Sequence, residues 1–273
     1  MTLVDRLKRR LRPAPPAPTP PRPLDYVFVV TYGRSGSTLV QGLLNTLPRV
    51  LVRGENSLYV LPIYRACAQA MAFRELHYNH RPRQVSSAFY GLRSVQQRRF
   101  TTATRRLVTE TLLGPVRRDE VDVIGFKEVL WHEVSPEETE GFFAFLDEAF
   151  PGAKYVLNQR THENVVGSGF WQKHDDDEVF AALRRVEQIQ AYLRESRPAQ
   201  VLDTRYELIT SDDREVSDQQ LRNLAEFVVG CCDDALMASL RETLSTGHGP
   251  YAFGASHGRR KRRSGEGDED EGD

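Results

Sequence analysis

The chain has 273 residues, enough for one large α/β domain with a proper core or for two small domains. Hydrophobic residues make up 40% and charged residues 27%, and the net charge is −1, so no overall basic field favours nucleic acid and we expect no nucleic-acid partner. No apolar run approaches the roughly 20 residues of a membrane-spanning helix. The cysteines, Cys67, Cys231 and Cys232, make a poor disulfide framework, which favours a cytoplasmic location.

The two ends of the chain have biased compositions. Residues 1–23 join a short basic segment to a proline-rich stretch, and residues 255–273 join a basic block to an acidic one. Such segments cannot bury an apolar core, so we expect a disordered leader and a disordered tail around one domain at 24–254. A basic helix with one apolar face is the alternative for the leader, and it would allow a weak contact with a membrane surface.

Strand patterns and helix patterns alternate along the predicted domain. Short apolar segments predict strands at 26–31, 50–53, 122–126, 153–158 and 200–204. Amphipathic patterns predict a helix after the first strand and further helices at 136–150, 177–195, 218–229 and 234–244. This alternation indicates an α/β fold with a mainly parallel β-sheet flanked by helices on both faces. Ligands of such folds bind at the carboxyl ends of the strands.

The first predicted strand runs into the sequence Tyr-Gly-Arg-Ser-Gly-Ser-Thr at 32–38. Gly33 and Gly36 permit backbone geometry that other residues resist, and Ser37 is well placed to cap the following helix. Backbone N–H groups at a helix start, with the positive end of the helix dipole, hold phosphate or sulfate. A plain turn needs neither a cation nor three hydroxyls, so we predict an anion site whose further donors are Arg34, Ser35, Ser37 and Thr38.

A P-loop nucleotide kinase is the weaker interpretation of this turn. The kinase pattern is G-x-x-x-x-G-K-[ST], whereas here Gly36 is followed by Ser37 and Thr31 stands where the first glycine should be. The sequence also has no clear Walker B aspartate after an apolar strand to hold magnesium.

Three segments carry a resemblance to a known family. The sequence TYGRSGSTLV resembles the 5′-phosphosulfate loop of sulfotransferases that use 3′-phosphoadenosine 5′-phosphosulfate (PAPS), above all the bacterial and carbohydrate enzymes with R-S-G-S-T. In FPGAKYVLNQRTHENVVGSGFW, Arg160 and Ser168 occupy the positions of the family's Arg and Ser that bind the 3′-phosphate. DTRYELI is similar to the family's R-Y-E-x-L segment. The resemblance spans about 26–230 and implies the P-loop-like sulfotransferase fold.

The resemblance implies a PAPS-dependent sulfotransferase that needs no metal. Its acceptor would be a hydroxyl on a small molecule, and we favour a carbohydrate or glycolipid because the R-S-G-S-T loop resembles that of carbohydrate enzymes. A non-catalytic anion-binding protein of the same fold stays open as an alternative.

Sulfuryl transfer needs fixed cations near the transferring group and a base for the acceptor hydroxyl. We assign the cations to Arg34 and Lys127. The base is predicted to be Glu55, because similar bacterial enzymes carry a catalytic Glu in the corresponding region, with Glu128 as the alternative. The cytosolic enzymes have K-x-H with a His base, and this chain has Val129 in place of that His.

Overall fold

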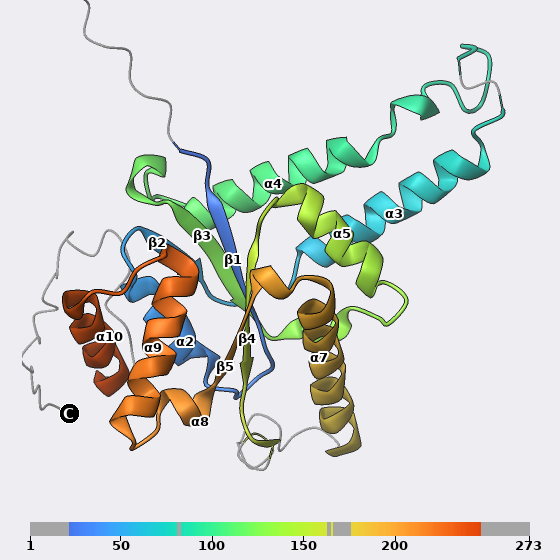
Figure 1. The fold of residues 1–273 in the computed structure, drawn as a ribbon. Coiled ribbons are helices and arrows are strands. Elements are labelled where there is room, and N and C mark those ends of the chain that lie inside the picture. The colour runs from blue at the N-terminus through green and yellow to red at the C-terminus, as the bar shows by residue number, and fades with distance from the viewer. Residues whose placement is uncertain (1–21, 81–82, 163–164, 166–175, 247–273) are drawn as a thin grey trace, which may run out of the picture.

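A parallel β-sheet forms the centre of the protein (Figure 1). The computed structural model describes residues 22–80, 83–162, 165 and 176–246. In this part of the chain the strand order is β2-β3-β1-β4-β5, and every neighbouring pair is parallel. The predicted α/β class is confirmed, and each strand begins and ends within two residues of its prediction: β1 (Asp25–Val30), β2 (Val50–Arg53), β3 (Val123–Glu128), β4 (Lys154–Gln159) and β5 (Val201–Arg205).

The central strand β1 is apolar on both sides, which explains why both faces of the sheet are covered. Tyr26, Phe28 and Val30 belong to one hydrophobic cluster, and Val27 and Val29 belong to the other. Successive side chains of a strand point to opposite faces, so a strand that is buried throughout must have packed helices on each side.

Helices cover the sheet in two layers, as the sequence predicts (Figure 1). One face packs against α2 (Ser37–Thr46), α9 (Arg214–Val229) and α10 (Asp234–Thr246). The opposite face packs against α3 (Val60–Leu76), α4 (Gln97–Leu113), α5 (Thr139–Ala149) and α7 (Asp176–Ser196). Short helical segments complete the described part: η1 (Leu92–Ser94), η2 (Arg118–Glu120), η3 (Leu130–Glu133), η5 (Pro198–Gln200) and α8 (Tyr206–Ile209).

The sequence patterns did not single out α3 and α4, and these two helices differ from the others in shape. Their far ends project together from the body of the domain (Figure 1). Of the 17 residues of α3, only Val60, Leu61 and Cys67 are buried, so the helix has no regular apolar stripe for a periodicity argument to detect.

None of the helices in the described ranges combines the length and apolarity that crossing a membrane requires. The predicted leader and tail lie almost entirely outside the described residues, so the domain limits at 24 and 254 stay predictions.

The carboxyl ends of the parallel strands meet at one edge of the sheet, and the predicted site residues gather there. The loop at 31–36 follows β1, Lys127 lies near the end of β3, and Arg160 follows β4 directly. Parallel strands bring such positions together whatever their separation in the sequence.

Candidate active site

The loop between β1 and α2 has a left-handed turn at two positions. Arg34 has φ of 67° and Gly36 has φ of 77°, both in the region that favours glycine. Gly36, not Ser37, is the residue that precedes the helix, and no side chain caps it. The predicted capping role of Ser37 is therefore wrong, because the turn at Gly36 starts the helix at Ser37 itself. The amides of Ser37 and Thr38 begin α2, where no earlier carbonyl of the helix can accept them, whereas the Leu39 N–H donates to the Gly36 carbonyl at 3.0 Å.

Ser35 contributes to the loop in a different way from the prediction. It is fully buried, and its hydroxyl lies 2.6 Å from the hydroxyl of Thr31, which donates to the carbonyl oxygen of Asn158 at 2.9 Å. The side-chain amide of Asn158 in turn donates to the carbonyl oxygen of Ser35 at 2.9 Å. The Ser35 hydroxyl is thus hydrogen-bonded to Thr31 inside the protein, while the Thr31 hydroxyl and the Ser35 carbonyl attach the loop to Asn158 of β4.

A cavity of about 410 Å³ lies above the loop and joins the parts of the site that the sequence keeps apart. It contains three cationic side chains and one carboxylate, so its electrostatic character suits an anion. Its walls come from the loop and the start of α2, from the end of β3 and from the segments that follow β2, β3, β4 and β5: Gly33, Arg34, Gly36, Ser37, Thr38, Glu55, Lys127, Val129, Arg160 and Tyr206.

Lys127 and Glu55 form an ion pair in this cavity. Nζ of Lys127 lies 2.5 Å from Oε1 of Glu55, although the two residues are 72 positions apart. The Lys127 side chain is 6% exposed and the Glu55 side chain is 53% exposed. A buried cation is thereby aimed at the cavity beside a carboxylate that solvent and ligands can reach.

Glu128 lies next to Lys127 in the sequence but outside the cavity. Its side chain is fully buried, and both carboxylate oxygens accept backbone N–H groups. Oε2 accepts from Asn56 at 2.9 Å and from Leu58 at 2.8 Å, and Oε1 accepts from Val129 at 2.7 Å and from Leu130 at 3.1 Å. This geometry argues against Glu128 as the base, because neither oxygen faces the place where an acceptor would bind.

Arg160 is attached to the loop by its backbone and by its side chain. Its N–H donates to the Tyr32 hydroxyl at 2.9 Å, and that hydroxyl donates to the Arg160 carbonyl at 2.8 Å. Its guanidinium donates to the carbonyl oxygen of Arg34 at 3.2 Å. Burial raises the pKa of Tyr32, against a smaller lowering by its hydrogen bond with the Arg160 backbone, so the phenol keeps its proton.

Tyr206 lies between Arg160 and the loop. The site residues predicted from the sequence did not include it. The Arg160 guanidinium lies 4.4 Å from the centre of the Tyr206 ring. On the other side, the ring is so close to Gly36 that a Cβ atom there would be 2.0 Å from Cδ2 of Tyr206. Tyr206 belongs to the DTRYELI segment, so the sequence did contain a signal for it.

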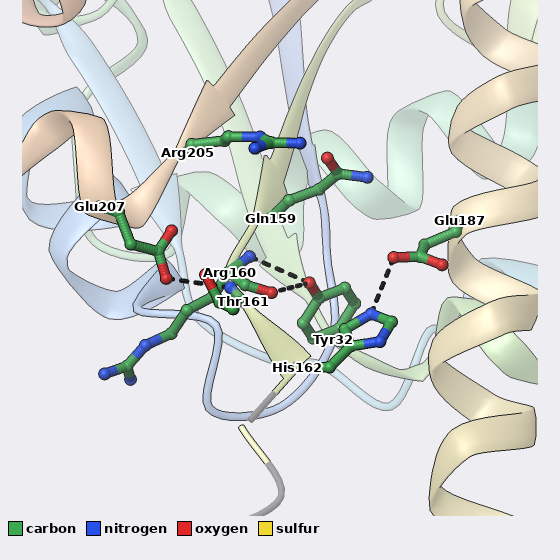
Figure 2. A pocket seen from close by; sticks show the side chains of 8 residues that line it. All are labelled: Tyr32, Gln159, Arg160, Thr161, His162, Glu187, Arg205 and Glu207. Atoms are coloured by element: carbon green, nitrogen blue, oxygen red, sulfur yellow. Dashed lines mark hydrogen bonds and ion pairs between the residues drawn. The ribbon is translucent and has the colours of Figure 1, made fainter. Parts of the chain in front are cut away.

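A second, smaller cavity of about 230 Å³ lies on the other side of Arg160 (Figure 2). The carboxylate of Glu207 accepts from the Thr161 N–H at 2.9 Å, and Nε2 of His162 lies 2.8 Å from Oε1 of Glu187. In Figure 2 the Arg160 side chain points away from His162 and Glu187, and Arg160 lines both cavities. These contacts fix the chain just after β4, where Arg160 is attached.

The predicted role of Ser168 and the predicted absence of a metal are not tested by these contacts. Ser168, the predicted partner of Arg160, lies outside the described residues. The described ranges contain no group of three or more His, Cys, Asp or Glu side chains that could hold a metal ion, and the metal-free reaction stays a prediction.

The fold and the loop at its sheet edge are those of a P-loop-like α/β protein, and the cavity at that edge is lined by Arg34, Lys127 and Arg160. A model described as "Sulfotransferase family" matches residues 25–228, well over half of the chain. The protein therefore belongs to the sulfotransferase family. This membership disfavours the kinase interpretation.

Two solved sulfotransferase domains are similar to this chain. The sulfotransferase domain of the Synechococcus PCC 7002 olefin synthase is 18% identical with a TM-score of 0.47, and the match covers 85% of this chain and 83% of that chain. The sulfotransferase domain from the curacin biosynthetic pathway is 16% identical with a TM-score of 0.44, covering 79% of this chain and 77% of that chain. No relative among the curated proteins matches the chain.

Proposed function

We propose that this protein transfers a sulfuryl group from PAPS to the hydroxyl of an acceptor, on a carbohydrate or glycolipid. The observation that carries the proposal is the single cavity in which the 32–38 loop, Lys127, Glu55 and Arg160 meet. Two anionic ends of one donor would need two groups of cations and donors, and the cavity offers both.

The residues of the cavity fit such a donor. Gly36 leaves no Cβ between the loop and Tyr206, and the start of α2 offers backbone N–H groups to the 5′-phosphosulfate end. Arg160 has a buried Nε atom for which the described residues provide no partner. A buried guanidinium N–H without an acceptor is costly, and a phosphate oxygen would satisfy it. We assign the 3′-phosphate to Arg160, with Ser168 as its second donor.

The transfer needs charge compensation and removal of one proton. The donor supplies the sulfuryl group. Lys127 and Arg34 compensate the negative charge on the sulfuryl oxygens and on the bridging oxygen, whose bond to sulfur breaks with its electron pair staying on the phosphate. Glu55 accepts the proton of the acceptor hydroxyl while the hydroxyl oxygen forms the new bond to sulfur. The products are a sulfate ester and 3′-phosphoadenosine 5′-phosphate.

Glu55 is better placed for this role than Glu128. Its carboxylate is half exposed, lines the cavity and lies beside the cation that would hold the sulfuryl group. The ion pair with Lys127 supports this assignment, because a general base must stand within hydrogen-bond reach of the proton that it removes.

The experiment uses the full chain and ³⁵S-labelled PAPS with carbohydrate and lipid extracts as acceptors. We expect the native protein to transfer the label to an acceptor and the Glu55→Gln variant to transfer none. Calorimetric titration with 3′-phosphoadenosine 5′-phosphate, and separately with ATP–Mg²⁺, should show binding of the former only. Tight binding without any transfer would instead support a non-catalytic anion-binding protein, and preference for ATP–Mg²⁺ would overturn the proposal.

A further inference from the structure

The segment that carries Glu55 has an unusual backbone. Ser57 and Leu58 have φ of 61° and 45°, so two successive non-glycine residues are in the left-handed region. Such conformations cost free energy and persist only where the surroundings enforce them. Leu58 is buried in the core, which fixes one end of the turn, while Glu55 at the other end is exposed. Something else must hold the backbone between them.

The carboxylate of Glu128 supplies that hold. Oε2 accepts the N–H groups of Asn56 and Leu58, one on each side of Ser57. Oε1 accepts the N–H groups of Val129 and Leu130, the chain that leaves β3. Hydrogen bonds to an ionised group are about twice as strong as neutral ones, so one carboxylate fastens the turn at 56–58 to the end of β3.

The end of β3 therefore contacts the Glu55 segment twice. Lys127 and Glu128 are neighbours in a strand, and their side chains leave it in opposite directions. Lys127 contacts the Glu55 carboxylate in the cavity, while Glu128 binds the backbone that follows Glu55 from within the protein. The first contact involves the reacting groups, and the second fixes where the base stands.

We infer that Glu128 is a positioning residue for the base Glu55: it holds the left-handed turn at 57–58 and so keeps the Glu55 carboxylate beside Lys127. The inference rests on the proposed role of Glu55. Glu128 does not touch the substrate, and its effect passes through the backbone of Asn56 and Leu58. The base thus lies just after β2, and its support ends the neighbouring strand β3.

The test compares Glu128→Gln with the native protein in the full chain. A glutamine has the same size, but its NH₂ group cannot accept the N–H groups that one carboxylate oxygen accepts now. The turn should relax and Glu55 should shift. Because a displacement near 1 Å can cost on the order of 10²-fold in rate, we expect kcat to fall between about tenfold and a hundredfold. The Kd for 3′-phosphoadenosine 5′-phosphate should change less than about twofold, since the loop and Arg160 are untouched.

A rescue experiment separates positioning from general damage. Glycine adopts positive φ without steric cost. In the Glu128→Gln background, Ser57→Gly should therefore let the turn at 57–58 form with fewer hydrogen bonds to hold it. We expect the double variant to recover part of the lost kcat. Asp147→Asn is the control for loss of a carboxylate charge: Asp147 is paired with Arg197, neither residue lines the cavity, and kcat of this variant should stay native.

The outcomes are distinct for the two proposals. If Glu55→Gln abolishes transfer while Glu128→Gln keeps native kcat, the positioning role is refuted and the proposed function stands. If Glu128→Gln loses kcat and ligand binding in parallel, with no recovery from Ser57→Gly, the carboxylate supports the fold in general and the inference is also wrong. If Glu55→Gln retains full transfer, the proposed base itself is wrong.

Discussion

Replacing Gly36 with alanine tests whether the loop, Tyr206 and Arg160 act as one unit. Gly36 has φ of +77°, and a left-handed residue with a Cβ atom costs roughly 1–2 kcal/mol. The new Cβ would also lie 2.0 Å from a carbon of the Tyr206 ring, far inside van der Waals contact. The ring must move, and Arg160, which lies 4.4 Å from the ring centre, loses its support.

A second glycine of the chain serves as a matched control for the cost of a Cβ atom at positive φ. Gly230, which ends α9, has φ of +81°, but a Cβ atom there would meet nothing within 4 Å. Gly230→Ala should therefore lower the free energy of unfolding by about 1–2 kcal/mol and leave ligand binding unchanged. The difference between the two variants separates the effect of a Cβ atom at the site from its backbone cost.

The expected loss of binding follows from the contacts of Arg160. Removing one hydrogen bond to a charged group costs about 1.5–3 kcal/mol. This corresponds to a Kd for 3′-phosphoadenosine 5′-phosphate raised by roughly tenfold to a hundredfold. Calorimetric titration gives the Kd, and urea unfolding gives the stability of both variants. A Gly36→Ala protein that binds this ligand as tightly as Gly230→Ala would refute the reasoning.

Further substitutions test the remaining parts of the account. Arg34→Ala should cost on the order of 2–4 kcal/mol in the transition state, and unchanged turnover in a folded protein would contradict the loop assignment. Trp131→Ala should lower the free energy of unfolding by about 3–5 kcal/mol, because the side chain is fully buried and donates to the Val29 carbonyl; thermal unfolding would show a mild effect if this role were wrong. Trimming residues 1–21 and 258–273 should leave the Kd for 3′-phosphoadenosine 5′-phosphate unchanged, and weaker binding by either shortened protein would show that its segment supports the site.

The sheet and its edge could be predicted because their signals are local. Apolar runs mark the strands, and the glycines and serines at 32–38 mark the loop between β1 and α2. The long-range contact of Tyr206 with Gly36 could not be found by periodicity, because the two residues are far apart in the sequence and neither lies in an amphipathic pattern. The pairing of β4 with β1 on one side and with β5 on the other brings them together.

The choice between Glu55 and Glu128 could not be made from the sequence for a different reason. All six residues of β3 are buried, so the strand has no alternation of polar and apolar residues to indicate which side chains point to the cavity. The sequence places Lys127 and Glu128 side by side, whereas the structure directs the first to the cavity and the second to the backbone at 56–58. The capping role of Ser37 failed for a similar reason, since the left-handed turn at Gly36 depends on conformation that residue type alone does not determine.

The most direct test of the central claim compares two ligands that differ only in the 3′-phosphate. 3′-Phosphoadenosine 5′-phosphate and adenosine 5′-phosphate are titrated into the native protein and into Arg160→Ala, with circular dichroism to check folding. The account predicts that the native protein strongly prefers the first ligand. Arg160→Ala should lose most of that preference while binding the second ligand almost as before, because the removed cation faces a group that only one ligand carries. A native protein without preference, or equal losses for both ligands in the variant, would contradict the claim that this cavity holds PAPS.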